Sequence, residues 1–147
     1  LVDAMIKGKT GPGYYPGDYI SSPTWPGVAP GVKGINNAIS PKYLDLRAFG
    51  RVKAGPPVLW IRGADDSVVS DTSAFDLALL GSLGVVPGWP GAESCPPQPM
   101  VTQMKAVLDE YAQAGGQVDN LVLPDCGHSP HIERPDEVRA ELLRILG

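Results

Sequence analysis

Two short loops carry the side chains of this sequence that could do acid–base chemistry. The first contains Asp66, in the run Gly63-Ala64-Asp65-Asp66-Ser67-Val68-Val69. The second contains His128, in the run Asp125-Cys126-Gly127-His128-Ser129-Pro130-His131. A carboxylate that accepts from one imidazole nitrogen fixes the tautomer of the ring, and the other nitrogen can then take a proton from a nucleophile. If the loops meet, Asp66 and His128 would form the orienting half of a catalytic triad.

Each loop follows a segment that is typical of a buried strand. The apolar run 57–61 ends just before Gly63, and residues 118–123 form a second strand that Pro124 ends. Between the strands, a stripe of apolar residues at helical spacing predicts an amphipathic helix that ends at Gly115-Gly116. The stripe consists of Met100, Met104, Val107, Leu108 and Tyr111. We expect these side chains to be core rather than a cofactor site.

Pro135 suits the first turn of a final helix, and Asp136 and Glu137 suit its N-terminal dipole. The region 71–83 has partial helical spacing, and residues 84–99 form a loop rich in glycine and proline. The alternation of strands and helices predicts an α/β fold with a parallel sheet, in which functional groups collect beyond the carboxyl ends of the strands. Adjacent strands are about 4.8 Å apart, which brings the two loops within reach of each other.

With these elements in place, both loops resemble motifs of the α/β-hydrolase family. Gly63-x-x-Asp66-x-Val68-Val69 is similar to the turn that carries the family's catalytic acid, and the run 127–135 is similar to its histidine loop. The acid precedes the histidine by 62 positions, which also fits the family's chain order. The resemblance covers residues 57–147. It implies the C-terminal part of an α/β-hydrolase parallel sheet with flanking helices.

The resemblance implies a serine hydrolase that acts on small-molecule esters or related acyl substrates, with no metal and no organic cofactor. Asp66 would orient His128, and Val68 and Val69 would border the substrate beside the acid. One alternative keeps the fold but uses an aspartate nucleophile, as enzymes acting on epoxides or haloalkanes do. Others are a non-catalytic binding module of the same fold and a complete small α/β binding protein.

The nucleophile of such an enzyme is expected on a Gly-x-Ser-x-Gly elbow upstream of the acid, and no serine has that context. The nearest match, Ser82 in Leu80-Gly81-Ser82-Leu83-Gly84, lacks the first glycine and lies between acid and histidine, so we reject it. The family's oxyanion-hole loop is also missing. We therefore expect an upstream polypeptide to complete the fold, and we expect the isolated chain to be inactive.

Other residues compete for the same roles. Asp65 is the competitor of Asp66 as the acid, and His131 is expected to pack under its loop or to cap the final helix. Cys126 is expected to be a small buried residue. A disulfide between Cys95 and Cys126 is conceivable, but we favour two thiols.

The first 56 residues have a different character from the rest. Of the 18 glycines and 16 prolines, half fall within residues 1–57, so a long helix or a central strand is excluded there. We interpret residues 1–56 as a lid-like irregular segment and residues 57–147 as the C-terminal half of the hydrolase core. The chain starts without Met and without a visible signal peptide, so we expect it to begin within a larger protein and to be cytoplasmic.

The composition of the chain excludes several classes of partner and site. The chain has 147 residues and a net charge of −4, without clusters of Lys or Arg, which argues against nucleic acid as a partner. No stretch approaches about 18 uninterrupted apolar residues, so we expect no membrane span. Two cysteines are too few for a disulfide framework, and we expect no metal site.

Overall fold

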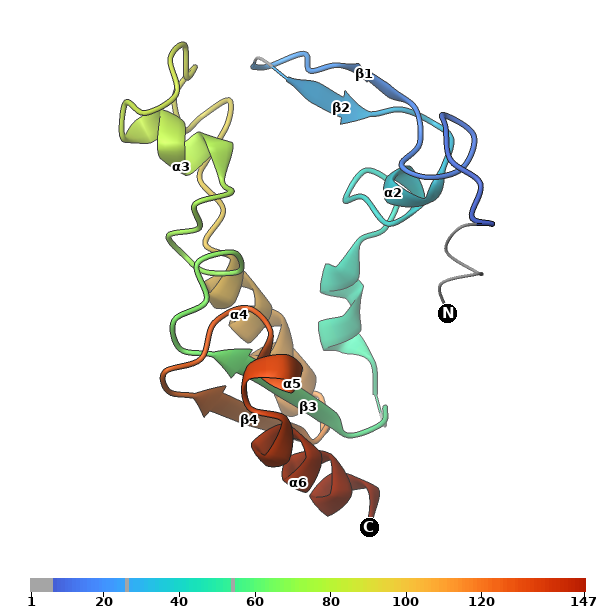
Figure 1. Ribbon diagram of the computed structural model, residues 1–147, viewed down its shortest axis with the longest axis vertical. Helices are drawn as coiled ribbons and strands as arrows, with labels where there is room; N and C mark the ends of the chain where they lie inside the picture. Colours follow the sequence, from blue (N-terminus) through green and yellow to red (C-terminus); the bar gives the residue numbers. More distant parts are fainter. Residues whose placement is uncertain (1–6, 26, 54) are drawn as a thin grey trace. The chain divides into compact units, whose positions relative to one another are not determined.

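The computed structural model describes residues 7–25, 27–53 and 55–147 of a mixed α/β chain (Figure 1). Residues 1–6, 26 and 54 lie outside the described residues, and with them the start of the expected lid segment. The chain divides into two compact units, residues 1–46 and residues 47–147. Both loops with candidate catalytic residues belong to the second unit.

A parallel pair of strands forms the centre of the second unit. β3 (Val58–Gly63) pairs with β4 (Val118–Leu123) over their whole length, from Val58 opposite Val118 to Gly63 opposite Leu123. Because the two strands end in register, the loops that follow them start side by side. This sheet has two strands in the described part of the chain, so the structure establishes a mixed α/β chain with a small parallel sheet.

Helices connect and follow these strands. The connection from β3 to β4 holds a short helix, α3 (Leu77–Ser82), and a longer one, α4 (Met100–Gln113). α3 begins where the Asp76 carboxylate accepts from the amides of Ala78 and Leu79, which is the usual way to satisfy the first donors of a helix. After β4 come the single turn α5 (Pro130–Glu133) and the helix α6 (Pro135–Leu146), each with proline at its start.

The core beneath the two loops is small. Buried Leu123, Cys126 and Val138 pack together, with Ile61 and Leu121 against them, so α6 contributes to this core through Val138. The apolar stripe of α4 is buried at Leu108 and Tyr111. Met104, in contrast, is 44% exposed, so the expectation that the whole stripe is core was wrong. Periodicity identifies the apolar face of a helix. In the described part of the chain, other residues pack against only part of that face of α4.

The second unit begins at residue 47, ten residues before residue 57, where the sequence analysis placed the boundary. A 3-10 helix, η1 (Leu46–Arg51), brings the Phe49 ring onto the Tyr111 ring of α4 with centroids 4.7 Å apart. The Tyr111 hydroxyl donates to the carbonyl of Pro56 at 2.6 Å. A stretch rich in glycine and proline has no periodicity of its own that would reveal such an attachment.

The first unit is mostly irregular, as its composition predicts, but it contains a short antiparallel pair, β1 (Tyr19–Ser21) and β2 (Val28–Pro30), and one helical turn, α2 (Ile35–Ala38). A polar cluster stabilises it. The Asp18 carboxylate accepts from the amides of Val32 and Lys33 at 2.9 and 2.6 Å and from the Asn37 side chain at 2.8 Å. Many apolar side chains of this unit, such as Tyr19 and Val32, are exposed.

None of the helices in the described ranges has the length and the apolar character that crossing a membrane requires.

Candidate active site

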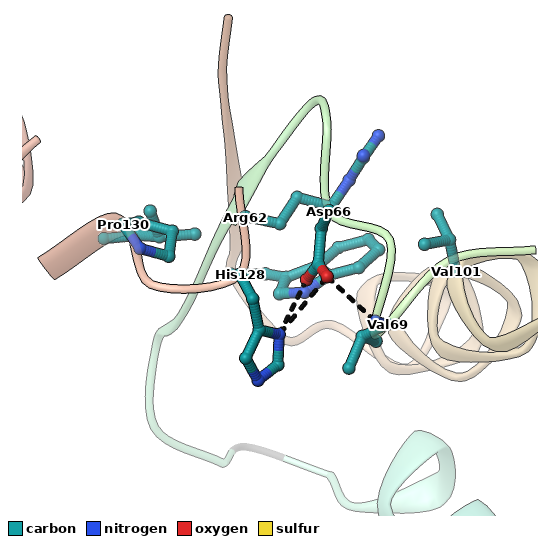
Figure 2. A pocket seen from close by; sticks show the side chains of 8 residues that line it. Arg62, Asp66, Val69, Val101, His128 and Pro130 are labelled. Carbon is teal, nitrogen blue, oxygen red and sulfur yellow. Dashed lines mark hydrogen bonds and ion pairs between the residues drawn. The ribbon is translucent and has the colours of Figure 1, made fainter. Parts of the chain in front are cut away.

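The structure brings Asp66 and His128 into contact at the carboxyl ends of β3 and β4. Nδ1 of His128 lies 3.0 Å from Oδ2 and 3.2 Å from Oδ1 of Asp66 (Figure 2). Asp66 follows the last residue of β3 by three positions, and His128 follows the last residue of β4 by five. The parallel register therefore places the two side chains together although 62 positions separate them.

The Asp66 carboxylate is held by its own turn. Oδ1 accepts from the amides of Val68 and Val69 at 2.8 and 2.9 Å, and the side chain is only 10% exposed. Burial alone would raise the pKa of Asp66, but hydrogen bonds from the Val69 amide, from His128 and from the Val68 amide outweigh it and leave the pKa below its ordinary value. The carboxylate is thus ionised and fixed at neutral pH, which is the state needed to orient an imidazole.

His128 presents its other ring nitrogen to solvent. The side chain is 51% exposed, and Figure 2 shows Nε2 pointing away from Asp66. Because an ionised carboxylate can only accept, Nδ1 must carry the proton in the contact with Asp66, and the neutral ring then has its lone pair on Nε2. In the described part of the chain no hydrogen bond joins Nε2 to a hydroxyl or thiol. The lone pair of Nε2 therefore faces solvent.

Backbone contacts fix the two loops to each other. The amide of Asp65 donates to the carbonyl of Cys126 at 3.0 Å, and that of Ala64 donates to the carbonyl of Leu123 at 2.8 Å. A Cβ at Gly63 would collide with the carbonyl oxygens of Cys126 and Gly127. Glycine is therefore required at the end of β3 because the histidine loop lies directly against it.

A pocket of about 180 Å³ opens beside Asp66 and His128 (Figure 2). Of the two valines expected to border a substrate, Val69 lines this pocket. Val68 does not, and its carbonyl accepts from the Ser73 hydroxyl at 2.6 Å instead. The lining residues are Trp60, Ile61, Arg62, Asp66, Val69, Val101, His128 and Pro130. The pocket walls are thus mainly apolar, and Arg62 and the Asp66–His128 pair are their polar groups.

Five of these lining residues were not predicted as site residues from the sequence: Trp60, Ile61, Arg62, Val101 and Pro130. Trp60 and Arg62 lie two positions apart in β3, so they share a face of the strand, and the Arg62 guanidinium lies 5.5 Å from the Trp60 ring centroid. Val101 comes from the first turn of α4. Strand alternation was a usable signal for Trp60 and Arg62, whereas Val101 reaches the pocket through the packing of α4.

The competing residues lie elsewhere. Asp65 is exposed and makes its contact with the second loop through its amide. The His131 side chain is on α5 and does not line the pocket. The Ser82 hydroxyl donates to the carbonyl of Leu79 within α3. In the described part of the chain, none of these three side chains forms a hydrogen bond or an ion pair with Asp66 or His128.

Both cysteines are free thiols, as the sequence favoured. Cys126 is 1% exposed, and burial, followed by the negative charge of Glu133, raises the pKa of its thiol. A buried thiol that resists ionisation is a poor nucleophile. Cys126 is therefore a packing residue below the loop. Over residues 7–25, 27–53 and 55–147, the side chains of His, Cys, Asp and Glu form no group of three or more that could hold a metal ion.

Comparison of the chain with protein-family models, with curated proteins and with solved structures finds no match.

Proposed function

We propose that this chain supplies the acid and the base of a serine hydrolase of the α/β-hydrolase type, acting on esters or related acyl substrates. The observation that carries the proposal is the contact of His128 Nδ1 with the Asp66 carboxylate at 3.0 Å, with Nε2 facing outward. The buried, amide-bonded carboxylate provides a fixed acceptor, and the neighbouring pocket provides apolar walls. This is the arrangement that the sequence motifs of the two loops imply.

In this reaction His128 first acts as a base. Nε2 takes the proton of a serine hydroxyl while the serine oxygen attacks the carbonyl carbon of the ester, and Asp66 stabilises the imidazolium that forms. The same nitrogen then gives the proton to the departing alkoxide, which leaves as an alcohol, and an acyl-enzyme remains. Water attacks this intermediate in the same way, releases the acid and restores the serine.

The pocket offers apolar contacts next to the reacting carbonyl. Val69 and Val101 contribute its aliphatic walls. We infer that an apolar part of the substrate packs against these walls, and no step of this chemistry requires a metal or an organic cofactor.

The nucleophile would come from outside these 147 residues, on a polypeptide that adds to the free edge of β3. β3 is apolar from Val58 to Ile61, yet all of these residues remain half-exposed beside a single partner strand. β4 carries Asp119 and Asn120, which suit an outer strand of a sheet. Parallel sheets are normally covered on both faces and have several strands. We therefore expect a further strand to pair with β3.

Labelling with a fluorophosphonate probe tests this proposal without knowledge of the substrate. The probe reacts with a serine that a neighbouring base activates, and the intact masses of all polypeptides in a native preparation show which of them carries the adduct. We expect the adduct on a serine outside the 147 residues. His128→Asn should abolish labelling, whereas His131→Asn, the matched control on α5, should leave it unchanged.

Two results would overturn the proposal. An active preparation that resists the probe but incorporates ¹⁸O from labelled water into an aspartate during a single turnover would show an aspartate nucleophile. A preparation that neither labels nor hydrolyses p-nitrophenyl esters would show a non-catalytic protein. The 147-residue chain by itself should hydrolyse no such ester, because it lacks the nucleophile and the oxyanion hole.

A further inference from the structure

The carboxylate of Glu133 joins the two backbone amides on either side of His128. The amide of Gly127 donates to Oε2 at 2.7 Å, and the amide of Ser129 donates to Oε1 at 3.0 Å. Each carboxylate oxygen therefore serves one amide. Both amides lie outside helices and strands, so the side chain replaces the partners that regular structure would provide.

Local structure aims Glu133 at the loop. Ser129 precedes α5, and its carbonyl accepts from the amides of Ile132 and Glu133 at 2.8 and 2.9 Å, which closes one tight turn. The next residue, Arg134, donates from its guanidinium to the carbonyl of Pro124 at 2.9 Å. The turn that carries Glu133 is thus attached to the chain before and after His128.

The chemistry of the contact selects a carboxylate. Hydrogen bonds from the amides of Gly127 and Ser129 lower the pKa of Glu133, so it is ionised at neutral pH and both of its oxygens can accept. Glutamine has one acceptor oxygen and would turn its NH₂ group, a donor, toward the second amide. One of the two hydrogen bonds would then be lost.

The His128 ring depends on this support because it has few hydrogen bonds that would hold it in place. The side chain is half-exposed, and its one hydrogen-bonding partner among the described residues is Asp66. The direction of Nε2 is therefore set by the Asp66 contact together with the backbone at residues 127–129. We propose that Glu133 is a positioning residue that holds His128 for proton transfer, a role that rests on the function proposed above.

The test compares Glu133→Gln and Glu133→Ala with Glu137→Gln. Glu137 is the matched control, because it ion-pairs with Arg134 at 3.4 Å and contacts neither amide of the histidine loop. Two readouts are needed. The first is the rate of fluorophosphonate labelling per folded molecule in the native preparation. The second is the His128 tautomer from ¹⁵N-histidine NMR of the chain, together with hydrogen exchange of the Gly127 and Ser129 amides.

The chain has only two histidines, so His131 serves as an internal reference in the same spectra. We expect both Glu133 variants to label about 10- to 100-fold more slowly, because a misplacement of about 1 Å at a reacting group has an effect of this size. Their Gly127 and Ser129 amides should exchange faster, and the His128 tautomer should become mixed. Glu133→Gln should fall between the wild type and Glu133→Ala, and Glu137→Gln should match the wild type.

A purely structural role would give a different result. The Glu133 variants would then have a lower Tm, while the labelling rate of the folded protein and the His128 tautomer stayed unchanged, and the inference would be overturned. Failure of the proposed function is distinguishable from this. A wild-type preparation that does not label, combined with a changed tautomer in the Glu133 variants, would refute the hydrolase and support the positioning of His128.

Discussion

His128 Nδ1 and Asp66 Oδ2 lie 3.0 Å apart, and Oδ1 of the same carboxylate accepts two backbone amides of its own turn. The carboxylate is therefore anchored independently of the imidazole that it contacts. An acceptor that is already fixed can hold the ring in one orientation without having to be ordered by it. This relationship underlies the predictions on pH, on the loops and on turnover.

The hydrogen bonds to Asp66 should make stability depend on pH in acid. They lower the pKa of Asp66 in the folded protein, so on acidification the unfolded chain takes up the proton first. The contribution of this carboxylate to the free energy of unfolding is complete above the pKa of the unfolded state, at about pH 4, and is lost as pH falls through the lower pKa of the folded state. Asp66→Asn should therefore lose less stability than the wild type between about pH 5 and pH 2.5.

Urea unfolding at a series of pH values measures this difference. Asp65→Asn, which removes the exposed neighbouring carboxylate, should keep the pH dependence of the wild type. Equal acid losses in the wild type and in Asp66→Asn would mean that the hydrogen bonds to Asp66 do not stabilise the fold.

Gly63→Ala should disrupt the site without removing any functional group. The added methyl group would meet the carbonyl oxygens of Cys126 and Gly127, so one of the loops has to move. Forcing extra atoms into such a contact costs about 1–3 kcal/mol of stability. We expect a lower urea midpoint and slower fluorophosphonate labelling, while Gly13→Ala, where a Cβ meets nothing within 4 Å, should change neither.

Val69→Ala should change the substrate preference. Val69 lines the pocket and Val68 does not, so enlarging the pocket at residue 69 should favour longer acyl chains. Contact worth about 1 kcal/mol corresponds to a change of about fivefold in the ratio of kcat/KM for p-nitrophenyl hexanoate over acetate. The same ratio should stay constant in Val68→Ala. A constant ratio in Val69→Ala as well would place the acyl group outside this pocket.

Tyr111→Phe tests how residues 47–56 are attached to α4. The side chain of Tyr111 is fully buried and stacks on Phe49, and its hydroxyl donates to the carbonyl of Pro56. Removal of the hydroxyl leaves that carbonyl without this donor and should lower the free energy of unfolding by about 1 kcal/mol. Tyr15→Phe, at an exposed ring, should be neutral. No change in the Tyr111 variant would show that this contact does not stabilise the second unit.

Much of the second unit could be predicted from local patterns. The apolar run before Gly63, the stripe along α4 and the proline at the start of α6 predicted elements that the structure contains. The approach of Asp66 and His128 could be predicted because parallel strands that end together place their loops together. These are the features that depend on chain periodicity and sheet geometry.

Other features depend on contacts between segments that have no periodicity. The pair β1–β2 consists of three-residue strands, too short for an alternating pattern to stand out. Two further features are hydrogen bonds to backbone atoms, for which the sequence carries no direct signal. One joins Tyr111 to Pro56, and the other set joins Glu133 to the amides of Gly127 and Ser129. Met104 shows a different limit of sequence patterns. A clear apolar stripe on a helix does not reveal whether other side chains pack over it.

The most direct test of the central claim compares Asp66→Asn with Asp65→Asn in the rate of fluorophosphonate labelling of the native preparation. The two aspartates are adjacent in one turn, but only Asp66 contacts His128. If Asp66 orients the base, Asp66→Asn should label about 10⁴-fold more slowly with the fold intact, and Asp65→Asn should label like the wild type. Equal labelling rates in the two folded variants would contradict the account, because the carboxylate at position 66 would then have no part in activating the nucleophile.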